Sequence, residues 1–224
     1  MSETLKAWAG DARRLFHDAR EANGLEHAVV TFHRRVDEAV ALTVAGHGVR
    51  TACARGCSHC CHLRLEVTPA EAFTLADWLR ARFAPARLAA VLERLRANAA
   101  RTRELGTEGR KRTSLACALL GDDGACTAYE ARPAQCRRYH SLDVAACEAF
   151  HRDPANEALE SPLHPAVAHN AAVIVTQAQH AAREAGLDAE PVDMNIALLA
   201  ALEHPAARRR WRDGKKPFVA PLPA

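Results

Sequence analysis

Four cysteines lie within the nine residues from Cys53 to Cys61 and constrain this chain more than any other feature. They follow the pattern Cys-x3-Cys-x2-Cys-Cys, and the remaining four lie in a second short region. The members of the two regions are Cys53, Cys57, Cys60 and Cys61 in the first, and Cys117, Cys126, Cys136 and Cys147 in the second. We predict that the two regions meet in space around a metal ion or an iron–sulfur cluster.

The expected compartment supports this choice over disulfides. The N-terminus lacks the apolar stretch of a secretory signal, and no apolar run approaches the ~20 residues that span a bilayer. We therefore expect a cytoplasmic protein with no membrane partner. Thiols stay reduced in the cytosol, so eight cysteines there favour metal or redox chemistry.

Length and composition favour one helical domain. The chain has 224 residues, is 49% hydrophobic and contains only 5% aromatic residues. Residues of high helix propensity, such as alanine, arginine, leucine and glutamate, are abundant. We predict a single domain over residues 1–224, with a metal-binding core at 53–147 between N-terminal helices at 3–46 and C-terminal helices at 165–212.

Apolar periodicity predicts the individual elements. Thr68, Pro69 and Glu71 form a helix start with a capping box. Gly106 to Thr113 is polar and contains two glycines, and we interpret it as an exposed loop with a solvated basic run, for which a phosphate- or acid-binding role is the alternative. The fold class is mostly α, with a small β-hairpin at 114–129 beside the cysteine-rich centre. Helices are expected at 3–22, 25–45, 68–84, 86–105, 165–185 and 193–212, the last broken near Pro205, with a short strand at 63–67, a helical turn at 131–138, a helix capped by Asp143, a loop at 153–164 and an extended tail after 216.

Thiolate is a soft ligand that selects zinc, iron–sulfur clusters or Cu(I). The spacing from Cys57 to Cys60 lets one tight loop offer two sulfurs to the same centre, with Gly56 supplying the conformational freedom that such a loop needs. Adjacent side chains tend to diverge, so the Cys60–Cys61 pair favours a large centre. We expect a [4Fe–4S] cluster, with zinc as the alternative.

The first ligands that we expect are Cys57, Cys60, Cys126 and Cys136. The other four cysteines are further ligands or form a second site, and Cys117 and Cys147 have the alternative of being small buried apolar residues. Spacing alone leaves open whether there are two tetrathiolate sites or one cluster. Residues that could ligate or hydrogen-bond to the sulfurs are His59, His62, His140, Tyr129, Arg132 and Arg137.

Two motifs resemble a known family. The run from Cys53 to Cys61, followed by Glu66-Val67-Thr68-Pro69-Ala70-Glu71-Ala72, resembles the opening of the YkgJ-type cysteine-cluster family, which is described as zinc- or iron-chelating. Cys126-Thr127-Ala128-Tyr129-Glu130-Ala131-Arg132-Pro133-Ala134-Gln135-Cys136-Arg137 resembles its second signature. The resemblance implies a metal centre of eight cysteines and a similarity to the cysteine-rich part of flagellin lysine methylase, which is associated with an iron–sulfur cluster. The first gap is x3 here and x2 in the family.

Several functions remain open at this point. The first is a cluster-binding protein with a redox role or a role in modifying another protein. The others are a zinc-stabilised interaction module, a methyltransferase related to flagellin lysine methylase, and a radical S-adenosylmethionine enzyme. The last is disfavoured because two expected helices precede the cysteine loop, where that class has the first strand of a βα barrel. The basic stretch Arg208 to Arg212 is interpreted as a charged helix end, and a net charge of +3 is too small to indicate a nucleic-acid partner. The partner or substrate that we expect is a protein.

Overall fold

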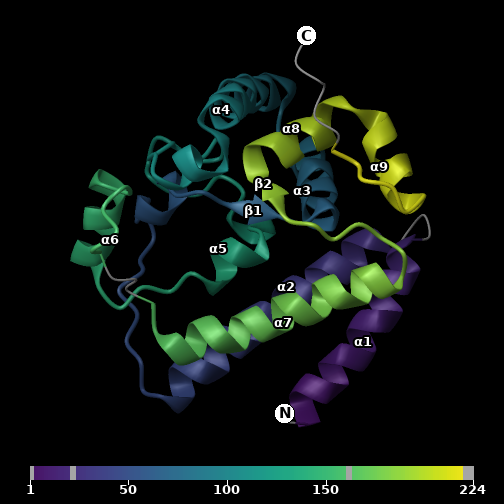
Figure 1. Ribbon diagram of the computed structural model, residues 1–224, viewed down its shortest axis with the longest axis horizontal. Coiled ribbons are helices and arrows are strands. Elements are labelled where there is room, and N and C mark those ends of the chain that lie inside the picture. Colours follow the sequence, from purple (N-terminus) through teal and green to yellow (C-terminus); the bar gives the residue numbers. More distant parts are fainter. Residues whose placement is uncertain (1–2, 21–23, 160–162, 219–224) are drawn as a thin grey trace.

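The computed structural model describes residues 3–20, 24–159 and 163–218. The predicted mostly helical class is confirmed (Figure 1). One group of helices consists of α1 (Glu3–Arg20), α2 (Leu25–Gly46) and α7 (Pro165–Glu184), each packed on the other two. The last residues of the first predicted helix, 21 and 22, and the tail from 219 lie outside the described residues.

Small residues let these three helices approach closely. Trp8, Ala12 and Phe16 lie one turn apart along α1 and are almost fully buried, and the buried ring of Phe32 on α2 stacks against that of Trp8. This spacing places the apolar side chains on one face of each helix. The first helical group is therefore held by one continuous apolar seam.

A second group consists of α3 (Pro69–Arg82), α4 (Pro85–Lys111), α8 (Met194–Glu203) and α9 (Pro205–Arg212), and α8 packs against each of the others (Figure 1). The predicted capping box is present, with Thr68 and Glu71 exchanging hydrogen bonds. The predicted break at Pro205 separates α8 from α9. In the predicted basic stretch on α9, Arg208 binds the backbone oxygen of Phe73 and the carboxylate of Asp77, while Trp211 is fully buried.

A short antiparallel pair joins the middle of the chain to its C-terminal part. Strand β1 (Glu66–Val67) pairs with β2 (Val192–Asp193), with Glu66 opposite Asp193. The predicted hairpin at 114–129 closes through one antiparallel bridge between Leu120 and Cys126. Strand β1 follows the first cysteine region in sequence, and the hairpin carries Cys117 and Cys126, so each β feature adjoins a cysteine region.

Three short helices complete the cysteine-bearing part: η1 (His59–His62), η2 (Tyr129–Ala131) and α5 (Ala134–Arg138). They are followed by α6 (Val144–Arg152), whose N-terminus is capped, as predicted, by the side chain of Asp143. Helix α6 packs against η1, and α5 packs against α2 and α7. No helix among the described residues is long and apolar enough to cross a membrane.

The exposed loop predicted from Gly106 to Thr113 is wrong. Helix α4 continues to Lys111 and is broken only at Gly106, where φ is 62° and ψ is −177°. The second part of the helix directs Arg110 into the interior, where its side chain is 3% exposed and lies 3.7 Å from the carboxylate of Asp193. The polar composition of this segment suggested a loop, because the sequence around Arg110 does not show that its acidic partner, Asp193, lies far along the chain.

The backbone at Gly106 yields the first testable prediction. An L-residue with positive φ is strained, so Gly106→Ala should lower the free energy of unfolding by about 1–2 kcal/mol. An added methyl group there meets no atom within 4 Å, so the loss would come from the backbone alone. Gly10→Ala is the matched control, since Gly10 lies within α1 with equally open space and should gain about 0.5–1 kcal/mol. Equal effects in chemical denaturation would contradict this assignment.

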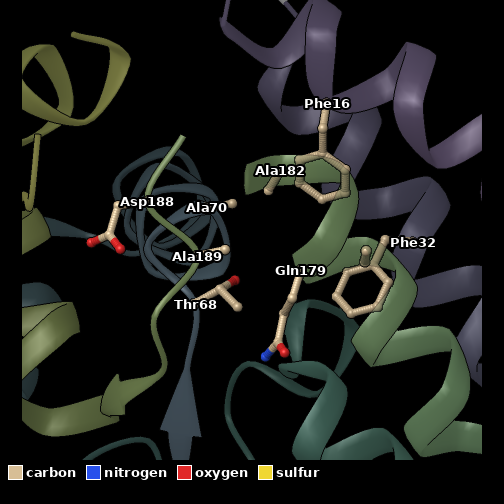
Figure 2. A pocket seen from close by; sticks show the side chains of 9 residues that line it. Phe16, Phe32, Thr68, Ala70, Gln179, Ala182, Asp188 and Ala189 are labelled. Atoms are coloured by element: carbon tan, nitrogen blue, oxygen red, sulfur yellow. The ribbon is translucent and has the colours of Figure 1, made fainter. Parts of the chain in front are cut away.

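A small cavity lies where the two helical groups meet. Figure 2 shows Phe16 and Phe32 on one side of it and Thr68 and Ala70 on the other, with Gln179 of α7 between them. Its volume is about 10 Å³, which is at the limit for one water molecule. The cavity is therefore a packing gap, and a ligand has no room there.

Candidate metal centre

The first cysteine loop is built from two successive turns. Cys57 donates its backbone N–H to Ala54, and Cys61 donates to Ser58, where η1 begins. Gly56 has φ of 86°, which confirms that the loop uses glycine for a conformation that other residues rarely adopt. This backbone gathers Cys57, Cys60 and Cys61 into one turn of chain.

The second cysteine region lies directly against the first. The backbone N–H of Cys117 binds the oxygen of Cys61 at 2.8 Å, and that of Leu115 binds the oxygen of His62 at 3.0 Å. At the next turn, a methyl group added to Gly124 would lie 2.8 Å from the oxygen of Gly56, so the two glycine turns touch. The sequence regions at 53–61 and 117–136 are therefore neighbours in space.

Four thiols form an inner group, which consists of Cys60, Cys117, Cys126 and Cys136. Burial raises the pKa of Cys136 well above its ordinary value, and the neighbouring Cys117, Cys60 and Cys126 raise it further. The pKa of Cys117 rises to about 11, mainly through burial and then through Cys126 and Cys60. The thiol of Cys60 hydrogen-bonds to Cys61, which is the largest of the effects that raise its pKa. The sulfurs of the inner group thus repel one another as thiolates.

An outer group consists of Cys53, Cys57 and Cys147, and it adjoins the inner group at Cys60. Burial raises the pKa of Cys53, and thiolates at Cys60 and Cys57 add to the effect. The pKa of Cys147 is raised by burial and then by Cys53, Cys57 and Cys60. Ser141 connects this group, because its backbone N–H lies 3.3 Å from the sulfur of Cys53 and its side chain hydrogen-bonds to Cys147.

Backbone N–H groups already point at three sulfurs. Leu119 donates to Cys117 at 3.4 Å, Ser141 donates to Cys53, and Ala128 donates to Cys126. Each bond lowers the pKa of the thiol that accepts it. Donors of this kind stabilise thiolate and are a regular feature around thiolate-bound metals.

Two arginines flank the centre and differ in role. The guanidinium of Arg132 stacks 3.6 Å from the ring centroid of Tyr129, and its charge partly offsets the rise in the pKa of Cys126 that burial causes. Arg137 instead fixes the backbone, donating to the oxygens of Arg132 and Glu130 and to the carboxylate of Asp37. Tyr129 is 60% exposed.

The histidines form a cluster that sequence reasoning identified only in part. The ring of His151 on α6 lies 4.1 Å from that of His62 and 5.7 Å from that of His59, centroid to centroid. We considered His59 and His62 as ligands from their position in the loop, but His151 lies too far along the chain for its spacing to show this contact. His140 has a buried Nδ1 without a hydrogen-bond partner in the described part of the chain.

The donor set fits a soft metal in chemistry, because thiolates with N–H donors around them are what zinc and iron–sulfur centres use. Among the described residues, no three His, Cys, Asp or Glu side chains already stand in a set that could hold a metal ion. Metal–sulfur bonds are about 2.3 Å long for zinc, so loading requires the protonated thiols to lose their protons and draw together. Which of the eight cysteines ligate stays a prediction.

Comparison with known proteins agrees with the two motifs. Residues 52–158 match the family model described as "CxxCxxCC: Putative zinc- or iron-chelating domain". All eight cysteines lie within the matched residues. No curated protein and no solved structure matches the chain. The YkgJ-type resemblance is the same domain and is therefore confirmed.

Proposed function

We propose, from the membership of residues 52–158 in the CxxCxxCC family, that this zinc- or iron-chelating cysteine cluster holds a [4Fe–4S] cluster. The expected ligands are the inner group, Cys60, Cys117, Cys126 and Cys136. A bound cluster would supply one-electron redox chemistry. The role that we infer is redox or the modification of another protein.

The observation that carries the proposal is the set of N–H groups directed at the sulfurs. Two of the inner four, Cys117 and Cys126, accept such bonds from the residues two positions later. These donors serve little purpose for a neutral thiol, which is a weak acceptor, but they stabilise a thiolate bound to a cluster and tune its potential. The local backbone is therefore arranged for charged sulfur.

The number of thiols in one region favours a cluster over a single zinc ion. Cys60 adjoins both the inner and the outer group, and its immediate neighbour Cys61 contacts its sulfur. A mononuclear zinc site needs four ligands and leaves the others unused. A cubane cluster presents a larger surface, which suits a region with more sulfur than one ion can bind.

The centre is open on one side. Cys53 and Cys60 are exposed as residues, whereas the other cysteines are partly covered. Ser141, shortly before α6, hydrogen-bonds to Cys53 and Cys147 of the outer group. We expect a protein electron donor or a protein substrate to approach from the exposed side.

The experiment that tests this function is elemental analysis with absorption spectroscopy on protein purified without oxygen. We expect brown protein with broad visible absorption and about four irons and four sulfides per chain. A second sample, reconstituted with iron and sulfide after chelation, should give the same stoichiometry. Colourless protein that contains zinc and remains colourless after reconstitution would contradict the cluster.

One observation favours a second candidate, a structural zinc module. Seven of the thiols fall into groups of four and three, and Cys61, which contacts Cys60, would supply the eighth sulfur that two tetrathiolate ions need. In that case zinc would approach two per chain, and the spectrum would show no visible band. The same elemental analysis separates the two functions.

A further inference from the structure

A pocket lined mainly by polar residues lies between α4, α8 and the β1–β2 pair. Its volume is about 330 Å³, within the range of small-molecule sites. Arg103, Gly106 and Arg110 line it from α4, Arg64 from the segment before β1, and Asp193 from β2. Figure 1 shows α4 lying beside these strands.

The break in α4 forms one wall of this pocket. Gly106 departs from helical geometry, and residues on both sides of it, Arg103 and Arg110, line the same space. The break therefore lies between Arg103 and Arg110 in the pocket wall, and Arg64 lines the same pocket from a separate segment.

The charges around the pocket do not cancel. Arg64 is paired with Glu66 at 2.6 Å, and Arg110 lies 3.7 Å from Asp193. Arg103 has no hydrogen bond or ion pair within the described ranges, so its guanidinium is uncompensated. Three cations facing two carboxylates leave one positive charge in a recess.

Buried polar atoms in the walls also lack partners. The Nε of Arg110 and the hydroxyl of Thr102 have no hydrogen bond in the described part of the chain, and their residues are 2% and 6% exposed. Oδ2 of Asp193, which faces Arg110, also lacks a hydrogen-bond partner among the described residues. Unsatisfied buried donors cost free energy, and native structures usually satisfy them with water or a ligand.

We propose that this pocket binds a small oxyanion, a phosphate or a carboxylate, between Arg103, Arg64 and the Nε of Arg110, whose two terminal nitrogens already donate to the backbone oxygens of Thr113 and Leu63. Arginine presents paired N–H donors that match the oxygens of both groups. Asp193 and Glu66 keep Arg110 and Arg64 in place, and the ligand compensates the charge of Arg103. No cysteine lines the pocket, although Cys117 lies near enough for its charge to act on Arg110.

The test measures anion affinity with inorganic phosphate and with malonate, each at constant ionic strength, by calorimetry and by the shift in thermal unfolding. Wild-type protein should bind at least one of them saturably, and which one binds identifies the ligand class. Arg103→Ala should weaken that binding about tenfold or more, because it removes a charge-assisted contact. Its side chain is exposed, so the fold should persist in circular dichroism.

Arg101→Ala is the matched control. Arg101 lies on the same helix, carries the same charge and is paired with Glu104 at 3.0 Å outside the pocket. Thr102→Val provides a second variant that keeps shape and net charge, and it should weaken binding several-fold. Absence of saturable binding in the wild type, or equal weakening by Arg101→Ala and Arg103→Ala, would overturn the proposal.

Discussion

Cys136→Ser should remove most of the bound metal and, with it, part of the stability of the fold. Cys136 lies on α5, remote from the first loop in sequence, and it shares the inner group with Cys60. Loss of one of four sulfurs weakens the centre and the connection between the two regions. We expect less than a quarter of the wild-type metal per chain and a loss of about 2–4 kcal/mol in the free energy of unfolding of the loaded protein.

Cys136→Ser removes a sulfur and also adds a buried hydroxyl, and a control variant is needed to separate these two effects. Ala128→Ser buries a hydroxyl beside Cys126, because Ala128 is only 1% exposed, but it removes no ligand. It should retain full metal content even where it lowers stability. Stripping the wild type with a chelator should bring its unfolding midpoint close to that of Cys136→Ser. Full metal content in Cys136→Ser would contradict the joining of the two regions.

Local signals in the sequence predicted most helices correctly, because their causes are local. Thr68 and Glu71 are three residues apart, Asp143 caps the residues that follow it, and Pro205 ends one helix and starts another. Each start or stop depends on the residues beside it. The proximity of the cysteine regions was also predictable, since a shared soft-ligand chemistry is the simplest use of eight thiols that are expected to stay reduced.

Distant contacts were not predictable in the same way. The partner of Arg110 is Asp193, and the partner of β1 is β2, both far along the chain. His151 joins the histidines of the first loop only because α6 packs on η1. The polar segment after Gly106 therefore resembled a loop, although tertiary packing keeps it helical. The ligands could not be predicted for a similar reason, because the spacing of the eight cysteines does not show which of them bind the same metal centre.

Glu71 of the capping box makes both local contacts, which the sequence predicts, and distant contacts, which it does not. The hydrogen bonds of Glu71 with Thr68 follow from a short motif. Its second oxygen, however, accepts the backbone N–H of Ala134 at 2.7 Å and lies 3.0 Å from Nε2 of His33. One buried carboxylate thus connects α2, the start of α3 and the start of α5, which carries Cys136.

Glu71→Gln should therefore destabilise the protein strongly, by about 3–5 kcal/mol. The side chain is 5% exposed as a residue, and an amide cannot accept from Thr68, Ala134 and His33 at once. One of its own N–H groups would face a donor and leave a buried group unsatisfied. Glu104→Gln is the matched control, because Glu104 is exposed and, among residues 3–20, 24–159 and 163–218, is paired only with Arg101 at 3.0 Å. This variant should unfold at the wild-type denaturant concentration.

The pH dependence gives this prediction a second readout. Burial raises the pKa of Glu71, but the hydrogen bond and charge of His33 and the N–H groups of Ala134 and Thr68 outweigh it and hold the pKa below the ordinary value of 4.5. A lowered folded-state pKa means that the contribution is complete above pH 4.5 and disappears as the pH falls through the folded value. Denaturation of wild type and Glu71→Gln should differ most near neutral pH and converge in acid. A constant difference down to acidic pH would show that the carboxylate charge is not what joins the three helices.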